Sequence, residues 1–185
     1  MIKNKNDSRV RKNRESFFWA FAKVKEEKKP DDTIRMVDVY RTANKSRATF
    51  RRHFRNVGDM IEQKEAEMME EFERINLTGP DELVWRRILI FIAKNRKFFE
   101  YEFSQDGSRF VRKMLEKYRQ GTGKIFVRYE AKLNQRLVEM SDHEMYCFLK
   151  FWVMDGANIN EIKKVTERIK YIEYTIDKRW SSFLG

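Results

Sequence analysis

The spacing of the apolar residues is the feature that most limits what this chain can fold into. One run of seven apolar residues has intervals of three and four: Ile162, Val165, Ile169, Ile172, Ile176, Trp180 and Phe183. That spacing places them on one face of an α-helix with 3.6 residues per turn. Only two prolines and seven glycines interrupt the 185 residues, and no window of five alternates in the manner of a half-buried strand. The sequence therefore predicts an all-α protein.

Further stripes and helix signals divide the chain into successive helices. We expect helices over residues 10–28, 57–76, 84–99, 109–120, 124–140, 145–156 and 162–183, with two short helices and a turn between Thr33 and His53. Ser141-Asp142-His143-Glu144 fits a capping box that opens the helix from Met145, and Asn160 is a plausible N-cap for the last helix. Asn95 falls on the apolar face of the helix over 84–99.

The positive charge is concentrated in the first third of the chain. The whole sequence has 40 Lys and Arg against 29 Asp and Glu, and residues 1–56 hold 17 of the cations but only 7 of the acids. Such asymmetry indicates a basic module for a polyanion, with nucleic acid considered before an anionic membrane. We predict a DNA-binding domain over 1–56, a connecting helix over 57–76 and a second domain over 77–185. Lys3, Lys5, Arg9, Arg11 and Lys12 are either an arm that reaches DNA or a disordered tail.

Composition excludes several classes of protein. The longest apolar run is Ile88–Ala93, too short to span a membrane, and no signal-type apolar stretch follows Met1. Cys147 is the single cysteine, so an internal disulfide is impossible and a reducing cytoplasm is the expected location. With two histidines, one cysteine and no visible set of nucleophile, base and orienting group, we expect no enzyme, no metal and no cofactor.

The stretch from Ile34 to Phe54 has the chemistry of a helix-turn-helix. Ala43 is small enough for two helices to cross closely, Asn44 tolerates the left-handed turn between them, and Ser46 is a good N-cap for the second helix. That helix would present small, hydroxylated and cationic side chains to the major groove. The predicted DNA-binding residues are Arg35, Lys45, Ser46, Arg47, Ala48, Thr49, Arg51, Arg52 and His53.

This stretch resembles the helix-turn-helix of the TetR family of bacterial transcription regulators. The matching positions are Ile34, Met36, Val39, Ala43, Ser46, Thr49, Phe50, His53, Phe54 and Met60. The chain departs from the family pattern where Arg35 replaces a capping Thr, so that Thr33 would cap instead, and where Asn44 replaces Gly. Arg51 replaces a Tyr that touches the DNA backbone, and Val57 replaces a Lys.

The resemblance implies a DNA-binding regulator, expected to repress, that binds a near-palindromic operator as a homodimer. Its dimer would form through residues 143–184, with the two stripes there as the interface and Gly156 and Ala157 allowing close approach. The second domain would hold any small-molecule effector, with Trp85, Asn95, Phe99, Tyr129 and Trp152 as candidate contacts. Ordinary core aromatics are the competing interpretation of these residues. The protein would be cytoplasmic and associated with the nucleoid. The alternative is a TetR-like co-regulator that binds a protein partner or small ligand without its own operator.

Overall fold

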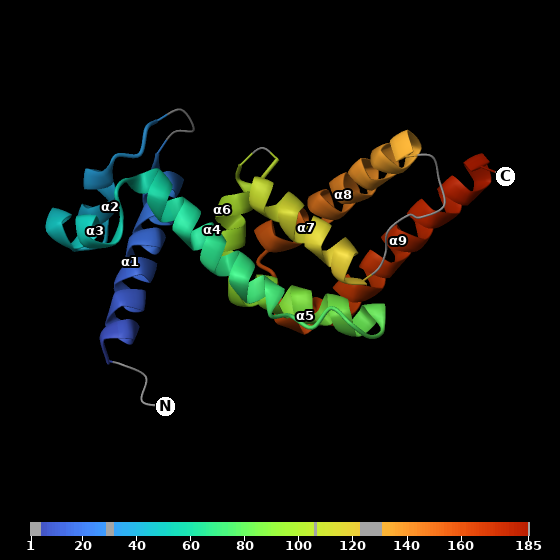
Figure 1. The fold of residues 1–185 in the computed structure, drawn as a ribbon, viewed down its shortest axis with the longest axis horizontal. Helices are drawn as coiled ribbons and strands as arrows, with labels where there is room; N and C mark the ends of the chain where they lie inside the picture. The colour runs from blue at the N-terminus through green and yellow to red at the C-terminus, as the bar shows by residue number, and fades with distance from the viewer. Residues whose placement is uncertain (1–4, 29–31, 106, 123–130, 185) are drawn as a thin grey trace. The chain divides into compact units, whose positions relative to one another are not determined.

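The computed structural model describes residues 5–28, 32–105, 107–122 and 131–184, and these residues contain helices and no strand (Figure 1). The all-α prediction is confirmed. The chain divides into two compact units, Met1–Met68 and Met69–Gly185. This division falls within the helix that the sequence predicts as the connection.

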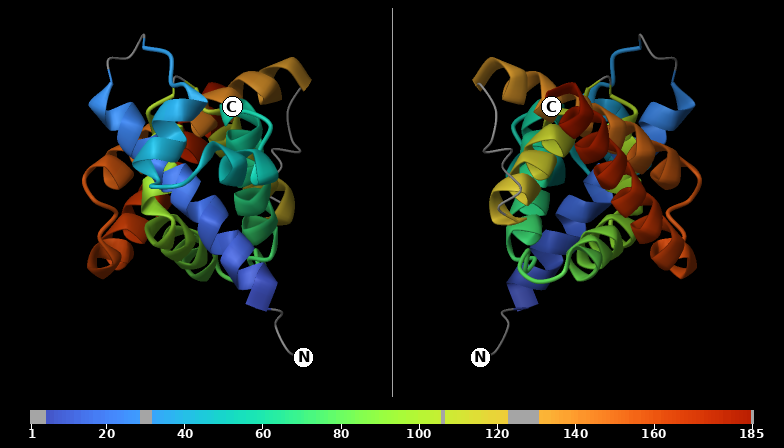
Figure 2. Two further views of the ribbon diagram at one scale, coloured as in Figure 1. Left: turned by 90° about the vertical axis from the view of Figure 1, so that its left-hand side faces the viewer. Right: turned by 90° about the vertical axis from the view of Figure 1, so that its right-hand side faces the viewer.

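The first unit contains α1 (Lys5–Glu27), α2 (Met36–Thr42), α3 (Arg47–His53) and most of α4 (Val57–Glu73). α1 lies alongside α2 and meets α3 through Phe17 (Figures 1 and 2). The ring of Phe17 packs edge-on against Phe50 at a centroid distance of 5.1 Å and against Phe54 at 6.1 Å. The core comprises Phe17, Phe18, Phe21, Val24, Val39, Phe50, Phe54 and Met60, all buried. Because these rings come from three segments, they fix how α3 is presented to solvent.

The second unit contains α5 (Asp81–Lys94), α6 (Arg96–Phe103), α7 (Arg109–Thr122), α8 (Ala131–Met154), a short 3₁₀ helix η1 (Ile159–Glu161) and α9 (Ile162–Leu184). α5 packs along α9 and α6 along α8. The largest fully buried residues here are Phe72, Trp85, Ile88, Leu89, Phe98, Phe99 and Phe103. As predicted from the stripe, Ile162, Val165 and Ile169 are buried.

The predicted helix over 84–99 is wrong in one respect, because it breaks at Asn95. The Asn95 side-chain Nδ2 donates to the Phe91 carbonyl oxygen at 3.1 Å. The backbone carbonyl oxygen of Asn95 accepts from the N–H groups of Phe98 and Phe99 in α6. An asparagine side chain that competes for a backbone carbonyl in this way ends one helix and begins another.

The predicted start of a helix at Ser141 is also wrong, because α8 runs without interruption from Ala131 to Met154. A capping sequence starts a helix only where the preceding residues leave helical geometry, and residues 131–154 contain neither glycine nor proline. The predicted cap at Asn160 moves to Asn158, whose side-chain oxygen accepts from the Asn160 N–H at 3.0 Å as η1 begins.

Part of each stripe expected to form an interface between two copies is buried within the subunit. On α8 the buried members are Met145, Leu149, Trp152 and Val153, and on α9 they are Ile162, Val165 and Ile169. Gly156 and Ala157, expected to allow close approach between two copies, lie at the end of α8. Their φ values are +104° and +47°, and their N–H groups donate to the Val153 and Trp152 carbonyls, so they terminate α8.

Candidate nucleic-acid interface

The turn between α2 and α3 has the local structure that the sequence predicts. Asn44 adopts φ +51°, and the Lys45 N–H donates to the Tyr40 carbonyl at 2.9 Å, which closes the end of α2. Ser46 then caps α3, because its Oγ accepts from the Thr49 N–H at 3.1 Å. The Ser46 and Thr49 hydroxyl oxygens also lie 2.9 Å apart and share a hydrogen bond. The first turn of α3 is therefore fixed before any partner arrives.

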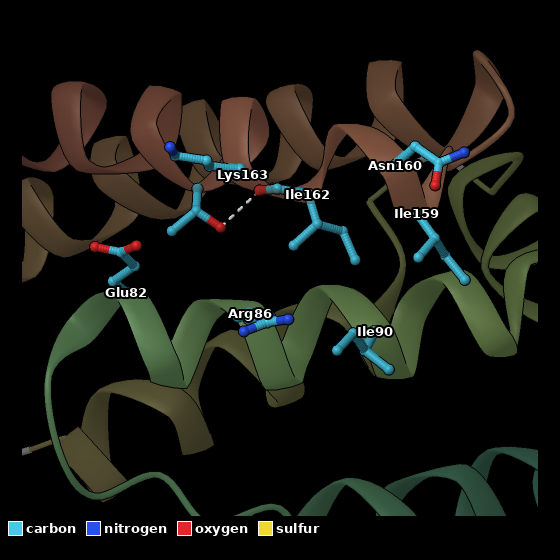
Figure 3. Close-up of a pocket in the computed structure, with 8 residues that line it drawn as sticks. Glu82, Arg86, Ile90, Ile159, Asn160, Ile162 and Lys163 are labelled. Carbon is cyan, nitrogen blue, oxygen red and sulfur yellow. Dashed lines mark hydrogen bonds between the residues drawn. The ribbon is translucent and has the colours of Figure 1, made fainter.

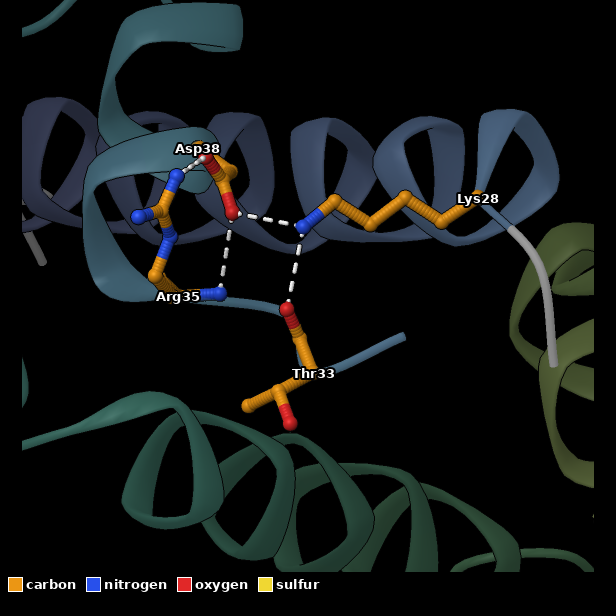
Figure 4. A network of polar contacts seen from close by, with 4 residues as sticks. All are labelled: Lys28, Thr33, Arg35 and Asp38. Atoms are coloured by element: carbon orange, nitrogen blue, oxygen red, sulfur yellow. Dashed lines mark hydrogen bonds and ion pairs between the residues drawn. The ribbon is translucent and has the colours of Figure 1, made fainter. Parts of the chain in front are cut away.

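The start of α2 is held by a carboxylate rather than by Thr33, which corrects the expected cap (Figure 4). Asp38 Oδ2 accepts from the Arg35 backbone N–H at 3.0 Å and from Lys28 Nζ at 2.8 Å. Thr33 contributes its carbonyl oxygen, which accepts from the same ammonium at 3.0 Å. The hydrogen bonds from Lys28 and from the Arg35 backbone lower the pKa of Asp38 from 3.8 to about 2. This network ties the end of α1 to the start of α2.

α3 buries one aromatic face and exposes the rest. Phe50 is fully buried and Phe54 nearly so, whereas seven predicted DNA-binding residues are exposed: Arg35, Lys45, Ser46, Arg47, Ala48, Arg51 and Arg52. Thr49 and His53 are half-buried. The structure gathers eight of the nine on α3 and the residues just before it. Arg35 lies apart at the start of α2, where its guanidinium is 3.4 Å from Asp38 Oδ1.

The cations of α3 lack acidic partners. Among the described residues, no acidic side chain lies within ion-pair distance of Arg47, Arg51 or Arg52, or of Lys45 just before the helix. Asp38 is the one acid between Thr33 and Arg55, and it is engaged at the start of α2. A row of exposed cations without counter-charges produces a positive potential that attracts a polyanion.

His53 sits between the aromatic core and the basic face. Its ring lies 6.4 Å from that of Phe17 and 6.1 Å from that of Phe54. Burial lowers the pKa of His53 below its usual 6.5, and the nearby charges of Arg14 and Arg52 lower it further. In the free protein the imidazole is therefore neutral near pH 7 and can donate one hydrogen bond.

Two cations beside this surface were not among the predicted contacts. The Arg14 guanidinium carbon lies 5.7 Å from the centre of the Phe54 ring, which brings it close to the end of α3. Arg55 is bonded to Asp59 through its backbone N–H at 2.8 Å and its guanidinium at 3.1 Å, although its side chain is 82% exposed. These contacts lower the pKa of Asp59, with the backbone hydrogen bond as the main cause. An Arg four residues before an Asp at a helix start was the available sequence signal.

The predicted effector residues are dispersed. Trp85 and Phe99 are fully buried, and Trp85 Nε1 donates to Glu173 Oε1 at 3.2 Å, an atom that also accepts from the Tyr118 hydroxyl at 2.8 Å. Trp152 is 7% exposed and its Nε1 has no hydrogen-bond partner within the described part of the chain. Asn95 is half-buried at the break between α5 and α6, and Tyr129 lies outside the described residues.

A surface groove lies between α5 and the η1–α9 segment (Figure 3). Its volume is about 360 Å³, and it is lined by Glu82, Arg86, Ile90, Ile159, Asn160, Ile162, Lys163 and Thr166. None of the four predicted effector residues that the structure describes lines it. Glu82 is paired with Lys170 at 2.9 Å, whereas Arg86 and Lys163 have no ion pair among the described residues. The groove therefore combines three isoleucines with two cations that are near enough to Glu82 to lower the pKa of its carboxyl group.

The fold and this interface define a class of protein: an all-α chain with a helix-turn-helix in its first unit and a helical bundle in its second. No family model matches the sequence, and no curated protein matches it. Among solved structures, the chain is similar to "Dihydroxyacetone kinase operon activator DhaS", with a TM-score of 0.52 and 15% identity over 89% of this chain and 96% of that one. The similarity extends over both units and concerns the fold.

The described residues lack a membrane-spanning helix and a cluster of metal-binding side chains. None of their helices is long and apolar enough to cross a membrane. No group of three or more His, Cys, Asp or Glu side chains in these segments could hold a metal ion.

Proposed function

We propose that the chain is a TetR-type transcription regulator that binds double-stranded DNA through α3. The observation that carries this proposal is a set of exposed cations that have no ion pair among the described residues: Arg47, Arg51 and Arg52 on α3, whose other face is anchored by Phe50, and Lys45 just before this helix. A rigid short helix of this kind fits the major groove, where its first residues reach base edges and its cations contact phosphates.

The role of each predicted contact follows from its place on or near α3. Arg47, Ala48 and Thr49 occupy the first turn and are the base-reading candidates. Arg51, Arg52 and His53 occupy the last turn and contact phosphates, as do Lys45 and Ser46 before the helix. Arg35, at the start of α2, contacts the backbone from the neighbouring helix.

We propose repression as the mode of action, through occupancy of the operator. The name of the structural neighbour describes the opposite effect on transcription, because it is called an operon activator. A reporter fused to the chain's own promoter decides between them. Deletion of the gene should raise expression from a repressed promoter and lower it from an activated one.

We further propose that the regulator is a homodimer formed through residues 143–184. Among the side chains that the structure describes on α8 and α9, four large hydrophobic ones are exposed: Phe151 at 76%, Met154 at 57%, Tyr171 at 58% and Tyr174 at 61%. Exposed aromatic and thioether groups of this size mark protein interaction surfaces. Two copies would place two α3 helices on half-sites about 34–36 Å apart. Light scattering should show a dimer for the wild type and a monomer for Phe151→Asp. Leu83→Asp, at an exposed leucine of α5, should leave the dimer intact.

Sequence-specific DNA binding across a salt series tests the main proposal. Each phosphate contact contributes about 0.9 to the slope of log K against log salt. Arg47→Ala should cost about 1–3 kcal/mol for the preferred site and relax base preference there. Lys94→Ala, an exposed cation of α5, serves as the control and should change neither. Affinity that does not depend on salt would refute DNA binding through this surface.

The groove between α5 and α9 favours a second candidate function, a ligand-binding co-regulator without its own operator. Arg86 and Lys163 would hold the anionic group of a small amphipathic ligand, and Ile90, Ile159 and Ile162 its apolar part. Calorimetric titration with straight-chain carboxylates of six to ten carbons tests this, with the corresponding amines as controls. Carboxylate binding lost in Arg86→Gln, combined with no sequence selected from random DNA, would favour the co-regulator.

A further inference from the structure

The first turns of α1 extend beyond the core of the first unit. The buried residues of this helix begin at Phe17 and continue to Val24, whereas Ser8, Arg9, Val10, Arg11 and Lys12 are all exposed. At 1.5 Å per residue, Arg9 lies about 12 Å along the helix axis from Phe17. No described part of the first unit covers this segment.

The charges of this segment have one sign. Between Ser8 and Arg14 there are four cations and no acid: Arg9, Arg11, Lys12 and Arg14. Arg11 has an exposed ion pair with Glu15 at 3.7 Å, of the kind that contributes little to stability. Within the described residues, Arg9 and Lys12 have no ion pair at all. Among the described residues, neither burial nor ion pairing accounts for Arg9 and Lys12.

The segment continues the positive surface of α3. Phe17 contacts Phe50 and Phe54, and one helical turn earlier Arg14 lies over the Phe54 ring. Arg11 lies three residues before Arg14 and on the same side of α1. Arg14 also lies close enough to His53 to disfavour protonation of its imidazole. The cations of α1 and those of the last turn of α3 therefore form one positive field, offset on α1 by the exposed pair of Arg11 with Glu15.

We infer that Arg9, Arg11 and Lys12 form a helical arm that binds DNA phosphates flanking the bases read by α3. This inference rests on the proposed function. Duplex DNA carries one negative charge for every 1.7 Å or so of its axis, so an arm that leaves the end of α3 meets further phosphates. The arm adds affinity and salt dependence, and it leaves base preference to α3.

The triple variant Arg9→Gln, Arg11→Gln, Lys12→Gln tests the arm. Glutamine forms helices almost as well as the residues it replaces, so circular dichroism should show little change. The slope of log K against log salt should become shallower by about 2–3, and affinity at 0.1 M salt should fall by about two orders of magnitude. The sequence selected from random DNA should stay the same.

The matched control removes three exposed cations from α7: Arg109→Gln, Arg112→Gln and Lys113→Gln. Both triple variants lose the same net charge, so the control separates contact from long-range attraction. Equal slopes for the two variants would overturn the arm, and so would a changed base preference in the α1 variant. Loss of binding to phosphatidylglycerol vesicles with an unchanged DNA slope would overturn it in favour of a membrane surface. A wild type that binds no DNA would instead refute the proposed function, so the two failures are distinguishable.

Discussion

Removing the Phe50 ring should destabilise the helix-turn-helix far more than it alters the basic surface. Phe50 is fully buried, with the rings of Phe17 at 5.1 Å and Phe54 at 5.4 Å. Phe→Ala in a core costs about 3–5 kcal/mol, from lost burial and from the cavity that remains. Because its neighbours are themselves anchored on α1 and at the end of α3, they cannot collapse into the space. We therefore expect Phe50→Ala to fall in the upper half of that range.

Hydrogen exchange measured by mass spectrometry locates this loss. The free energy of unfolding of a small domain is about 5–15 kcal/mol. A loss of about 3–5 kcal/mol from it should raise the rate of amide exchange in α1 and α3 by two orders of magnitude or more. Arg51→Ala is the matched control, because Arg51 is exposed and adjacent on the same helix. It should change stability by less than about 0.5 kcal/mol and still weaken DNA binding. A loss below about 1 kcal/mol for Phe50→Ala, or an equal rise in exchange in α5, would refute this account of the core.

Three further predictions follow from individual contacts. Asp38→Asn should lower the melting temperature above pH 4 and flatten its pH dependence between about pH 4 and 2. The pKa of Asp38 is lower in the folded than in the unfolded protein, so its carboxylate stabilises the fold at a pH above the unfolded pKa, and this stabilisation is lost as pH falls through the folded pKa. DNA binding should tighten as pH falls below 6.5, because a phosphate raises the depressed pKa of His53 and favours its protonation. His53→Gln should abolish this dependence in a titration across pH 5–8. Gly156→Ala should cost about 1–2 kcal/mol in denaturant unfolding, since φ at this position is +104°, whereas the change at Gly58, which has ordinary φ, should cost less.

The turn before α3 and the start of α3 could be predicted residue by residue because their determinants are local. Asn44 in the left-handed region and Ser46 as the cap of α3 are confirmed, and both depend on residues within four positions in the chain. The cap of α2 is also local, because Asp38 accepts from the Arg35 N–H three residues before it, and an acid at this position was the available signal. The hydrogen bond between Lys28 and Asp38, ten residues apart across a turn, could not be read from the sequence. The engagement of Arg55 by Asp59 was within reach of the sequence, as an i to i+4 pair.

Predictions failed where a pattern had two structural uses. An apolar stripe shows that a helix buries one face, but not whether its partner is in the same subunit or another. Leu149 and Ile169 proved to be buried within the subunit, and the exposed large side chains of α8 and α9 lie off the stripe. Likewise, Asn95 marked an interruption of an apolar face, and only the structure showed it ending α5.

The sequence by itself determined the helical class, the position of the helix-turn-helix and the concentration of positive charge in residues 1–56, because periodicity, capping and charge are properties of neighbouring residues. Tertiary structure decided which of those cations stand free. Lys28 and Arg55 are engaged by carboxylates, whereas Arg47, Arg51 and Arg52 face solvent and have no ion pair with any residue that the structure describes. The physical reason is that ion pairing and exposure depend on which helices pack together. In this chain the packing of Phe17 on Phe50 and Phe54 sets the face that α3 presents.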